Sequence, residues 1–217
     1  MKKIFLSPSN QSDNRYAYGD TNEAAQCGKI AEACRLALER CGFEVKLMQW
    51  ETAQERCKAA NAWGADLYLP IHTNAFDGSV TGTRLFVYEK KGDALKAAQA
   101  IFDALAPITP GRSENIQTYP QLIELNQPKA PSVYIEAEFH DNKDAAKWII
   151  ENTKEIGEAI CKGVCRHFGA QYVEETPPQK TLYRVQVGAY EVKENAQAMV
   201  EFLQKVGVAG FIVEVKG

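Results

Sequence analysis

Three ionisable side chains alternate with other residues late in the chain. They are Glu136, Glu138 and His140, and they directly follow the apolar, β-favouring residues Val133 and Ile135. In an extended strand this spacing of two places all three side chains on one face. Burying two carboxylates and an imidazole is costly unless they bind something, and a metal ion beside an acid–base carboxylate would satisfy them. A solvated edge strand is the alternative interpretation.

Two other polar clusters follow predicted strands. His72 and Asn74 come after the apolar run 66–71, and the polar loop 9–23 ends at Glu23. In parallel α/β sheets, sites form beyond the carboxyl ends of strands, so the simplest geometry brings all three clusters to one crevice. A catalytic zinc ion uses three protein ligands and a water, whose proton a nearby carboxylate takes. His72 and Glu23 are candidate ligands, although such residues are often only surface or helix-capping groups.

Strands and helices alternate in the part of the chain that must position these residues. Strands are predicted at 3–7, 43–47, 66–71, 83–88 and 132–139, and helices at 23–41, 52–63, 92–105 and 142–168. Residues 107–129 are rich in Pro, Gly, Ser and Asn and have no clear assignment. The alternation predicts an α/β domain, with a mostly parallel mixed sheet flanked by helices on both faces.

A polar stretch with a proline pair indicates a linker before a small C-terminal element. That element has a predicted strand at 182–187, a helix at 194–206 and a strand at 211–215. Two strands and one helix rarely bury enough apolar surface to be stable alone, so this βαβ element must pack on the first domain or pair with a copy of itself. The predicted boundaries are domain 1–171, linker 172–180 and C-terminal module 181–217.

Composition narrows the class of protein. The chain has 217 residues, is 45% hydrophobic and 24% charged, and carries a net charge of −3. No basic field suggests nucleic acid or an anionic membrane as partner, and no apolar run is long enough to span a membrane. The N-terminal stretch MKKIFLSPSN is too short in apolar residues for a signal peptide. We therefore expect synthesis in the cytoplasm without a signal peptide.

The chain contains six cysteines. Three are spaced by seven along one helical stripe, from Cys27 to Cys41. Cys161 and Cys165 lie close to His167, but this spacing fits no common zinc finger. Without a secretion signal, disulfides are not expected, so the cysteines are interpreted as buried free thiols.

Four motifs carry a resemblance to a known family. In chain order they are LSPSNQ with YGDTNE, PIHTNA at 70–75, the Gly-Thr to Tyr segment at 82–88, and PSVYIEAEFHDN at 131–142. With these motifs, residues 1–169 resemble the zinc-dependent N-acetylmuramoyl-L-alanine amidases of the type-3 family, which hydrolyse the amide between muramic acid and L-alanine in peptidoglycan. The resemblance implies that Glu23 and His72 are zinc ligands and that Glu136 is the catalytic carboxylate.

The sequence departs from the family at one expected ligand. The family's first histidine falls on Asn10, and a neutral amide oxygen is a poor zinc ligand. Our hypothesis is a zinc site of Glu23, His72 and His140. The alternative is that His140 is a loop histidine and that Asn10 or Gln11 fills the place weakly.

The zinc hypothesis gives roles to the remaining polar residues, among them Glu138, which replaces a glycine of the family. Glu136 takes the proton of the zinc-activated water and passes it to the leaving amine. Glu138 orients a ligand or binds the peptide's amide, and Asn74 positions the neighbouring histidine or the substrate. Asn10 is a further candidate for substrate binding.

The tail carries a second resemblance. Its segment VQVGAY at 185–190 and the later Asn195-Ala196 are similar to the first half of a sporulation-related repeat (SPOR) domain, which binds glycan strands stripped of peptides. A lone half leaves open sheet edges, so two chains are predicted to pair their tails into a four-stranded sheet and form a homodimer. A tail that only dimerises, without binding glycan, is the alternative.

The favoured function is a peptidoglycan hydrolase, with zinc as cofactor and peptidoglycan as partner. It would act on the cell wall after release, as a phage or prophage endolysin or at mother-cell lysis. The alternative is a non-catalytic peptidoglycan-binding protein that has lost zinc. A third candidate, a zinc aminopeptidase-like hydrolase, needs a second metal, which three histidines make hard to build.

Overall fold

The computed structural model describes residues 1–176 and 185–215. The chain divides into two compact units, Met1–Glu175 and Thr176–Gly217. Part of the predicted strand 182–187 therefore lies outside the described residues. None of the helices in the described ranges is long and apolar enough to cross a membrane.

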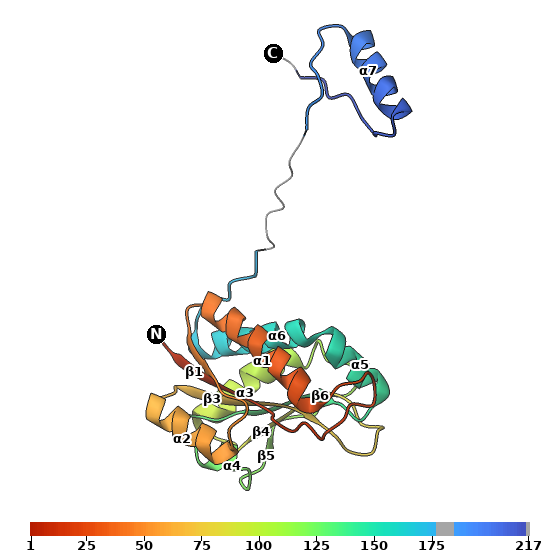
Figure 1. Ribbon diagram of the computed structural model, residues 1–217. Coiled ribbons are helices and arrows are strands. Elements are labelled where there is room, and N and C mark those ends of the chain that lie inside the picture. The colour runs from red at the N-terminus through yellow and green to blue at the C-terminus, as the bar shows by residue number, and fades with distance from the viewer. Residues whose placement is uncertain (177–184, 216–217) are drawn as a thin grey trace. The chain divides into compact units, whose positions relative to one another are not determined.

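The first unit alternates strands and helices (Figure 1). Its elements in chain order are β1 (Lys3–Pro8), α1 (Glu23–Arg40), β2 (Glu44–Leu47), α2 (Ala53–Trp63), β3 (Leu67–Asn74), β4 (Arg84–Val87), α3 (Gly92–Leu105), β5 (Gln117–Thr118), α4 (Ile123–Asn126), β6 (Tyr134–Phe139), α5 (Lys143–Glu151) and α6 (Thr153–Phe168). The sheet order is β2-β1-β3-β6-β4-β5, with β4 antiparallel to β6 and the other pairs parallel. The predicted fold class, a mostly parallel mixed sheet with helices on both faces, is confirmed.

The two faces of the sheet carry different side chains. Helices α1 and α6 lie along one face and α2 and α4 along the other (Figure 1). Toward α1, α3 and α6 the strands present fully buried aliphatic residues such as Leu69 and Ile71. Toward α2 and α4 they present Phe5 and Tyr68, whose rings stack with centroids 5.2 Å apart. Because side chains alternate along a strand, His72 of β3 lies on the same face as Tyr68.

Helix α1 begins at the carboxyl edge of the sheet. The Asn22 side chain caps it by accepting a hydrogen bond from the backbone N–H of Ala25 at 2.9 Å. This cap places Glu23 in the first turn, where the helix dipole stabilises a carboxylate. The start of α1 therefore carries an acidic group to the ends of the strands.

The predicted helix 142–168 is in fact two helices. Asn152 separates α5 from α6, and its side-chain nitrogen donates a hydrogen bond to the carbonyl of Trp148 at 2.7 Å. An asparagine that bonds to the preceding turn competes with the backbone hydrogen bonds of a helix, so one helix ends there and another begins. The unassigned segment 107–129 contains the short elements β5 and α4.

The second unit contains helix α7 (Lys193–Lys205), close to the predicted helix 194–206. The described parts of the two predicted strands, 185–187 and 211–215, are not strands. No residue of α7 is buried, and Phe211 is 78% exposed. Within the described ranges the predicted βαβ element thus has its helix but not its sheet.

Candidate functional site

Three of the predicted site residues meet where β3 and β6 end. An Oε1 of Glu23 lies 2.8 Å from Nδ1 of His72. His72 is the register partner of Glu136 on the neighbouring parallel strand, so these two side chains share a face. His72 Nε2 and Glu136 Oε2 are both buried without a hydrogen-bond partner. Two unpartnered polar atoms on neighbouring strands are typical of a ligand-binding or catalytic site.

These groups set one another's pKa values. Burial alone would lower the pKa of His72, but its contacts with Glu124 and Glu23 and the charge of Glu136 outweigh burial and raise it to about 9. Burial raises the pKa of Glu136 to about 8, against the charge of His72. Burial would also raise the pKa of Glu23, but the hydrogen bond with His72 lowers it. Glu136 is therefore suited to exchange a proton near neutral pH.

Sequence analysis missed a fourth member of the site, Glu124 of α4. Its Oε2 lies 3.9 Å from His72 Nε2, on the other side of the ring from Glu23. The Tyr68 hydroxyl donates a hydrogen bond to Glu124 at 2.7 Å, the Ser7 hydroxyl donates another, and the Arg56 guanidinium lies 3.3 Å away. The buried network holds the carboxylate in place. The sequence does not indicate this residue, because the four-residue helix that carries it shows no apolar periodicity.

The two amides considered as weak ligands have different surroundings. The Asn10 side-chain nitrogen donates to a backbone carbonyl at 3.2 Å. The Gln11 side-chain nitrogen lies 3.5 Å from Nδ1 of His72. Asn14 donates to the Gln11 oxygen at 3.1 Å and to Glu23 Oε2 at 2.6 Å, so it links the two side chains. Gln11 thus borders the Glu23–His72 pair.

A register shift in β6 separates His140 from this group. His72 of β3 pairs with Glu136 of β6. Two residues further along β3, Asn74 pairs with Phe139, which lies three residues further along β6. One extra residue in a strand moves the side chains that follow it to the opposite face. The expectation that Glu136 and His140 share one face does not hold for this reason.

The side chains of His140 and Thr73 lie on the same face of the sheet. Its ring stacks on Tyr16 with centroids 5.1 Å apart, and its Nδ1 lies 2.9 Å from the carbonyl oxygen of Thr73. Within the described part of the chain, the ligand atoms of Glu23, His72 and His140 do not all lie within 4.8 Å of one another. The zinc site with His140 as third ligand stays a prediction.

The other predicted binding residues, Glu138 and Asn74, contact backbone groups. Glu138 lies at the register shift, is fully buried, and accepts hydrogen bonds from the N–H groups of Phe139 and Gly82. Burial raises the pKa of Glu138 to about 7. The Asn74 side chain accepts a hydrogen bond from the N–H of Ala75 at 2.9 Å. Substrate-binding roles for these side chains stay predictions.

The residues present fit a zinc ion in part. Glu23 and His72 are ligand types that zinc prefers, they lie side by side, and a ring nitrogen of His72 is unpartnered. The amide of Gln11 also borders the pair, and an amide is a weak ligand. The carboxylate of Glu136 lies next to the pair, where acid–base chemistry needs one.

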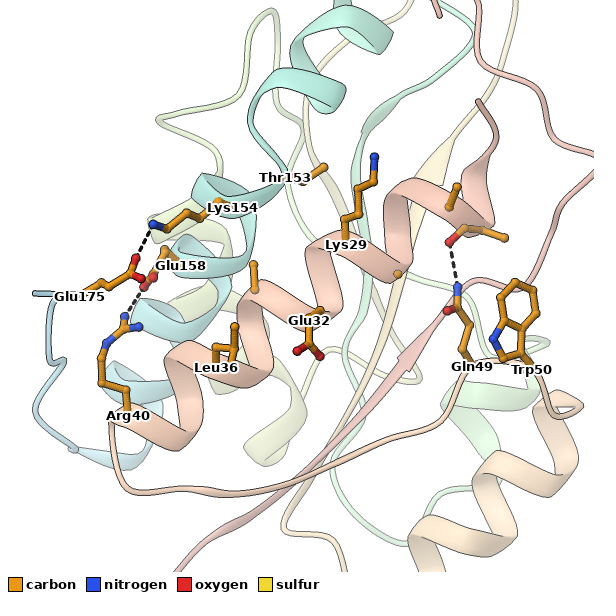
Figure 2. Close-up of a pocket in the computed structure, with 14 residues that line it drawn as sticks. Lys29, Glu32, Leu36, Arg40, Gln49, Trp50, Thr153, Lys154, Glu158 and Glu175 are labelled. Atoms are coloured by element: carbon orange, nitrogen blue, oxygen red, sulfur yellow. Dashed lines mark hydrogen bonds and ion pairs between the residues drawn. The ribbon is translucent and has the colours of Figure 1, made fainter. Parts of the chain in front are cut away.

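A groove of about 640 Å³ runs along α1, separate from this site (Figure 2). The exposed side chains of Trp50 and Leu36 line it. The Gln49 side chain donates a hydrogen bond to the carbonyl of Ala24 at 2.8 Å at its base. None of the candidate ligands or acid–base residues lines this groove.

Comparison with known proteins identifies the family. A family model described as N-acetylmuramoyl-L-alanine amidase matches residues 4–166, and a SPOR domain model matches residues 166–214. The first match covers most of the chain. The chain therefore belongs to the N-acetylmuramoyl-L-alanine amidase family and also carries a SPOR domain, which confirms both predicted resemblances.

Characterised relatives and solved structures agree with this assignment. The sporulation-specific N-acetylmuramoyl-L-alanine amidase of Bacillus subtilis (strain 168) is 24% identical over 220 residues, which cover 98% of this chain and 85% of that protein. The N-acetylmuramoyl-L-alanine amidase CwlM of Bacillus licheniformis is 25% identical over 223 residues, with the same coverage of 98% and 85%.

Among solved structures, the catalytic domain of the amidase CwlV from Bacillus (Paenibacillus) polymyxa var. colistinus aligns with a TM-score of 0.69 at 16% identity, covering 79% of this chain and 100% of that one. The catalytic domain of the CD27L endolysin targeting Clostridia difficile aligns with a TM-score of 0.66 at 23% identity, covering 76% and 98%. At these identities the alignments show the fold alone.

Proposed function

We propose that the chain is a peptidoglycan amidase that cleaves the bond between N-acetylmuramic acid and L-alanine. The observation that carries this proposal is the Glu23–His72 pair, which lies beside the unpartnered carboxylate of Glu136 at the ends of β3 and β6. Metal-assisted amide hydrolysis needs side chains that bind a metal ion and, beside them, a carboxylate that can accept and donate a proton. The family membership and the relatives' names support the same reaction.

Glu136 is the proposed acid–base residue. It is partly exposed, so a substrate can reach it, and its pKa of about 8 lets it change protonation state near neutral pH. It accepts a proton from the attacking water and donates that proton to the nitrogen of the leaving L-alanine. When bound, a zinc ion held by Glu23 and His72 would polarise the scissile carbonyl and activate the water.

Glu124 is proposed to orient His72. The imidazole lies between two carboxylates, with Nδ1 2.8 Å from Glu23 and Nε2 3.9 Å from Glu124. A carboxylate behind a ligating histidine selects the ring's tautomer and limits its rotation. Tyr68 and Arg56, both buried, keep the Glu124 carboxylate from turning away.

The third metal ligand is proposed to be His140 or Gln11, and two variants distinguish them. Zinc per chain is measured by elemental analysis of the dialysed protein in His140→Ala and in Gln11→Ala, each made together with Cys41→Ser so that only zinc at the Glu23–His72 site is counted. Loss of zinc in His140→Ala alone would mean that the ring leaves its contact with Thr73 to bind the metal. Loss in Gln11→Ala alone would support the arrangement seen in the structure. Zinc retained in both variants would contradict both assignments.

The activity test follows the bond that is cleaved. Purified protein is incubated with peptidoglycan and zinc, and stem peptides are identified by mass spectrometry. We expect peptides with a new N-terminal L-alanine from the wild type and none from Glu136→Gln. If the wild type binds the polymer but releases no such peptide, the non-catalytic alternative is correct. The replacement of the family's first histidine by Asn10 is the observation that favours this alternative.

The SPOR unit is proposed to bind glycan strands and to pair two chains. Its exposed apolar residues, including Phe211 and Val213, support a partner surface for this unit. Sedimentation equilibrium of the full chain and of a chain ending at Glu175 tests the pairing. We expect a dimer only for the full chain, and a monomeric full chain at micromolar concentration would contradict the proposal.

We further propose that this amidase is an endolysin. The fold is shared with the catalytic domain of an endolysin, and a relative of similar length is named a sporulation-specific amidase. Purified protein added to vegetative cell walls and to walls of sporulating mother cells distinguishes the two roles. Preferential digestion of the mother-cell wall would contradict the endolysin role.

A further inference from the structure

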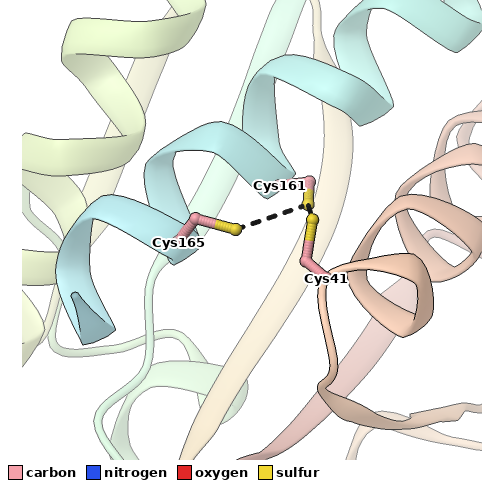
Figure 3. A group of neighbouring side chains, drawn as sticks. All are labelled: Cys41, Cys161 and Cys165. Atoms are coloured by element: carbon pink, nitrogen blue, oxygen red, sulfur yellow. Dashed lines mark hydrogen bonds between the residues drawn. The ribbon is translucent and has the colours of Figure 1, made fainter. Parts of the chain in front are cut away.

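Three cysteines that are far apart in the sequence meet at one end of the first unit. Cys41 caps the carboxyl end of α1, and Cys161 and Cys165 lie one turn apart on α6 (Figure 3). All are free thiols, and their sulfur atoms lie within 4.8 Å of one another. Within the described residues this is the one group of three such side chains compact enough to hold a metal ion.

The sulfur separations match those of thiolates on one tetrahedral ion. The Sγ of Cys161 lies 3.8 Å from that of Cys41 and 3.9 Å from that of Cys165. A tetrahedral zinc ion with Zn–S bonds of about 2.3 Å holds its sulfurs about 3.8 Å apart. A disulfide would need about 2.05 Å, so the sulfurs are not bonded to one another.

A hydrogen-bond donor and a positive charge lie beside the sulfurs. The backbone N–H of Val173 donates to the Cys41 sulfur at 3.3 Å, and a hydrogen bond of this kind stabilises the charged form. The Arg40 guanidinium, held by the carbonyl of Val173 and the carboxylate of Glu158, adds positive charge beside the group. Cys41 is only half-buried, so an ion and a water molecule can reach the sulfurs from solvent.

Without a cation, Cys161 and Cys165 keep their protons. Burial raises the pKa of Cys165 to about 11, and burial together with the other sulfurs raises the pKa of Cys161. Metal binding would displace the three protons into solvent, so affinity would increase with pH.

We propose that Cys41, Cys161 and Cys165 form a second metal site, which binds the thiophilic divalent cation Zn²⁺ through three thiolates and a water. The site is independent of the catalytic one. Helix α1 has 18 residues, so its two ends, which carry Glu23 and Cys41, lie about 27 Å apart. The ion would tie the end of α1 to α6 and to the segment around Val173, through which the chain leaves the first unit.

Cobalt substitution tests the site in the full-length, fully reduced protein. Thiolate ligands give Co²⁺ an intense sulfur-to-metal charge-transfer absorption, which a carboxylate–imidazole site cannot produce. We expect this absorption in the wild type and its displacement by Zn²⁺. It should persist in His72→Ala, which separates the result from the fate of the proposed catalytic site.

Serine variants identify the ligands. Cys41→Ser is the primary variant, because its half-buried side chain tolerates the change, and Cys161→Ser is the second. Both should lose the charge-transfer absorption. Cys34→Ser is the matched control, since Cys34 is a buried free thiol of α1 outside the group, and it should retain the absorption.

Three results would overturn the proposal. The first is no charge-transfer absorption in reduced wild type at excess Co²⁺. The second is an absorption that survives in both Cys41→Ser and Cys161→Ser. The third is elemental analysis that shows no difference in zinc per chain between the wild type and Cys41→Ser at saturating zinc.

Discussion

The two faces of the central sheet share their strands but have opposite chemistry. Neighbouring residues of β3 show this directly, since Ile71 packs among aliphatic side chains under α1 and α6, while His72 faces a network of charged groups under α4. On the first face most buried side chains are apolar. On the second, the charged groups depend on hydrogen-bonding partners, and His72 Nε2, Glu136 Oε2 and Arg56 Nε have none. Stability therefore resides mainly on one face, and chemistry on the other.

The largest effect is expected on the polar face, from removal of the Glu136 carboxylate, which has an unpartnered oxygen. Glu136→Gln should lower amidase activity by about 10²–10⁴-fold, because the amide cannot accept a proton. The variant should fold normally, since the change keeps the side chain's shape. The rate of release of N-terminal L-alanine measures the effect. Activity within tenfold of the wild type would place the acid–base group elsewhere.

A change on the aliphatic face should have the reverse effect. In Gly163→Ala the added Cβ would lie 2.4 Å from the Cα of Ile101 in α3, where backbone cannot yield easily. We expect a loss of about 3 kcal/mol in the free energy of unfolding, measured with urea, and unchanged activity of the folded fraction.

Gly28→Ala is the control for that variant. Its added Cβ would meet the end of the Gln49 side chain, 3.0 Å away, which can move. Because alanine also favours the helix, this substitution should be neutral or stabilising. Equal destabilisation by both variants would mean that tight packing is not what distinguishes the aliphatic face.

Glu124→Gln probes the polar face without touching the proposed metal ligands. A weaker partner for His72 should lower zinc affinity by about 10–100-fold, measured by competition with a chelating dye. The exposed carboxylate variant Glu32→Gln is the control and should bind zinc as the wild type does. Unchanged affinity in Glu124→Gln would restrict the network to a structural role.

The smallest expected effect is a pH-dependent gain in stability. The pKa of Glu136 is about 8 in the fold against an ordinary 4.5, so the metal-free wild type loses stability as the pH rises through this interval. Glu136→Gln lacks this loss. In chelator, its thermal midpoint should exceed that of the wild type by an amount that grows from pH 5 to 8. A constant difference across this range would contradict the assignment.

The parts of the fold that sequence could predict are those with local signals. Capping residues and apolar periodicity mark α1, and the paired strands follow from short apolar runs. The Glu23–His72 pair could be anticipated because parallel strands and following helices converge at one edge. These inferences need no knowledge of long-range contacts.

The parts that could not be predicted depend on contacts between distant residues. The register shift after Glu136 leaves the alternation in the sequence intact, so nothing local shows that His140 turns to the other face. Glu124 reaches His72 from a helix too short to recognise, and Cys41 joins Cys161 across 120 residues. Such contacts form only when the whole chain folds, so the local sequence does not predict them.

The extra residue in β6 has an evolutionary meaning. Two residues of β6, Ala137 and Glu138, stand opposite Thr73 alone, so deleting the codon of Ala137 would leave Glu136 paired with His72 and Phe139 paired with Asn74. His140 would then keep its side of the sheet. A lineage could shorten this strand by one residue without exchanging the side chains on either side of the deletion.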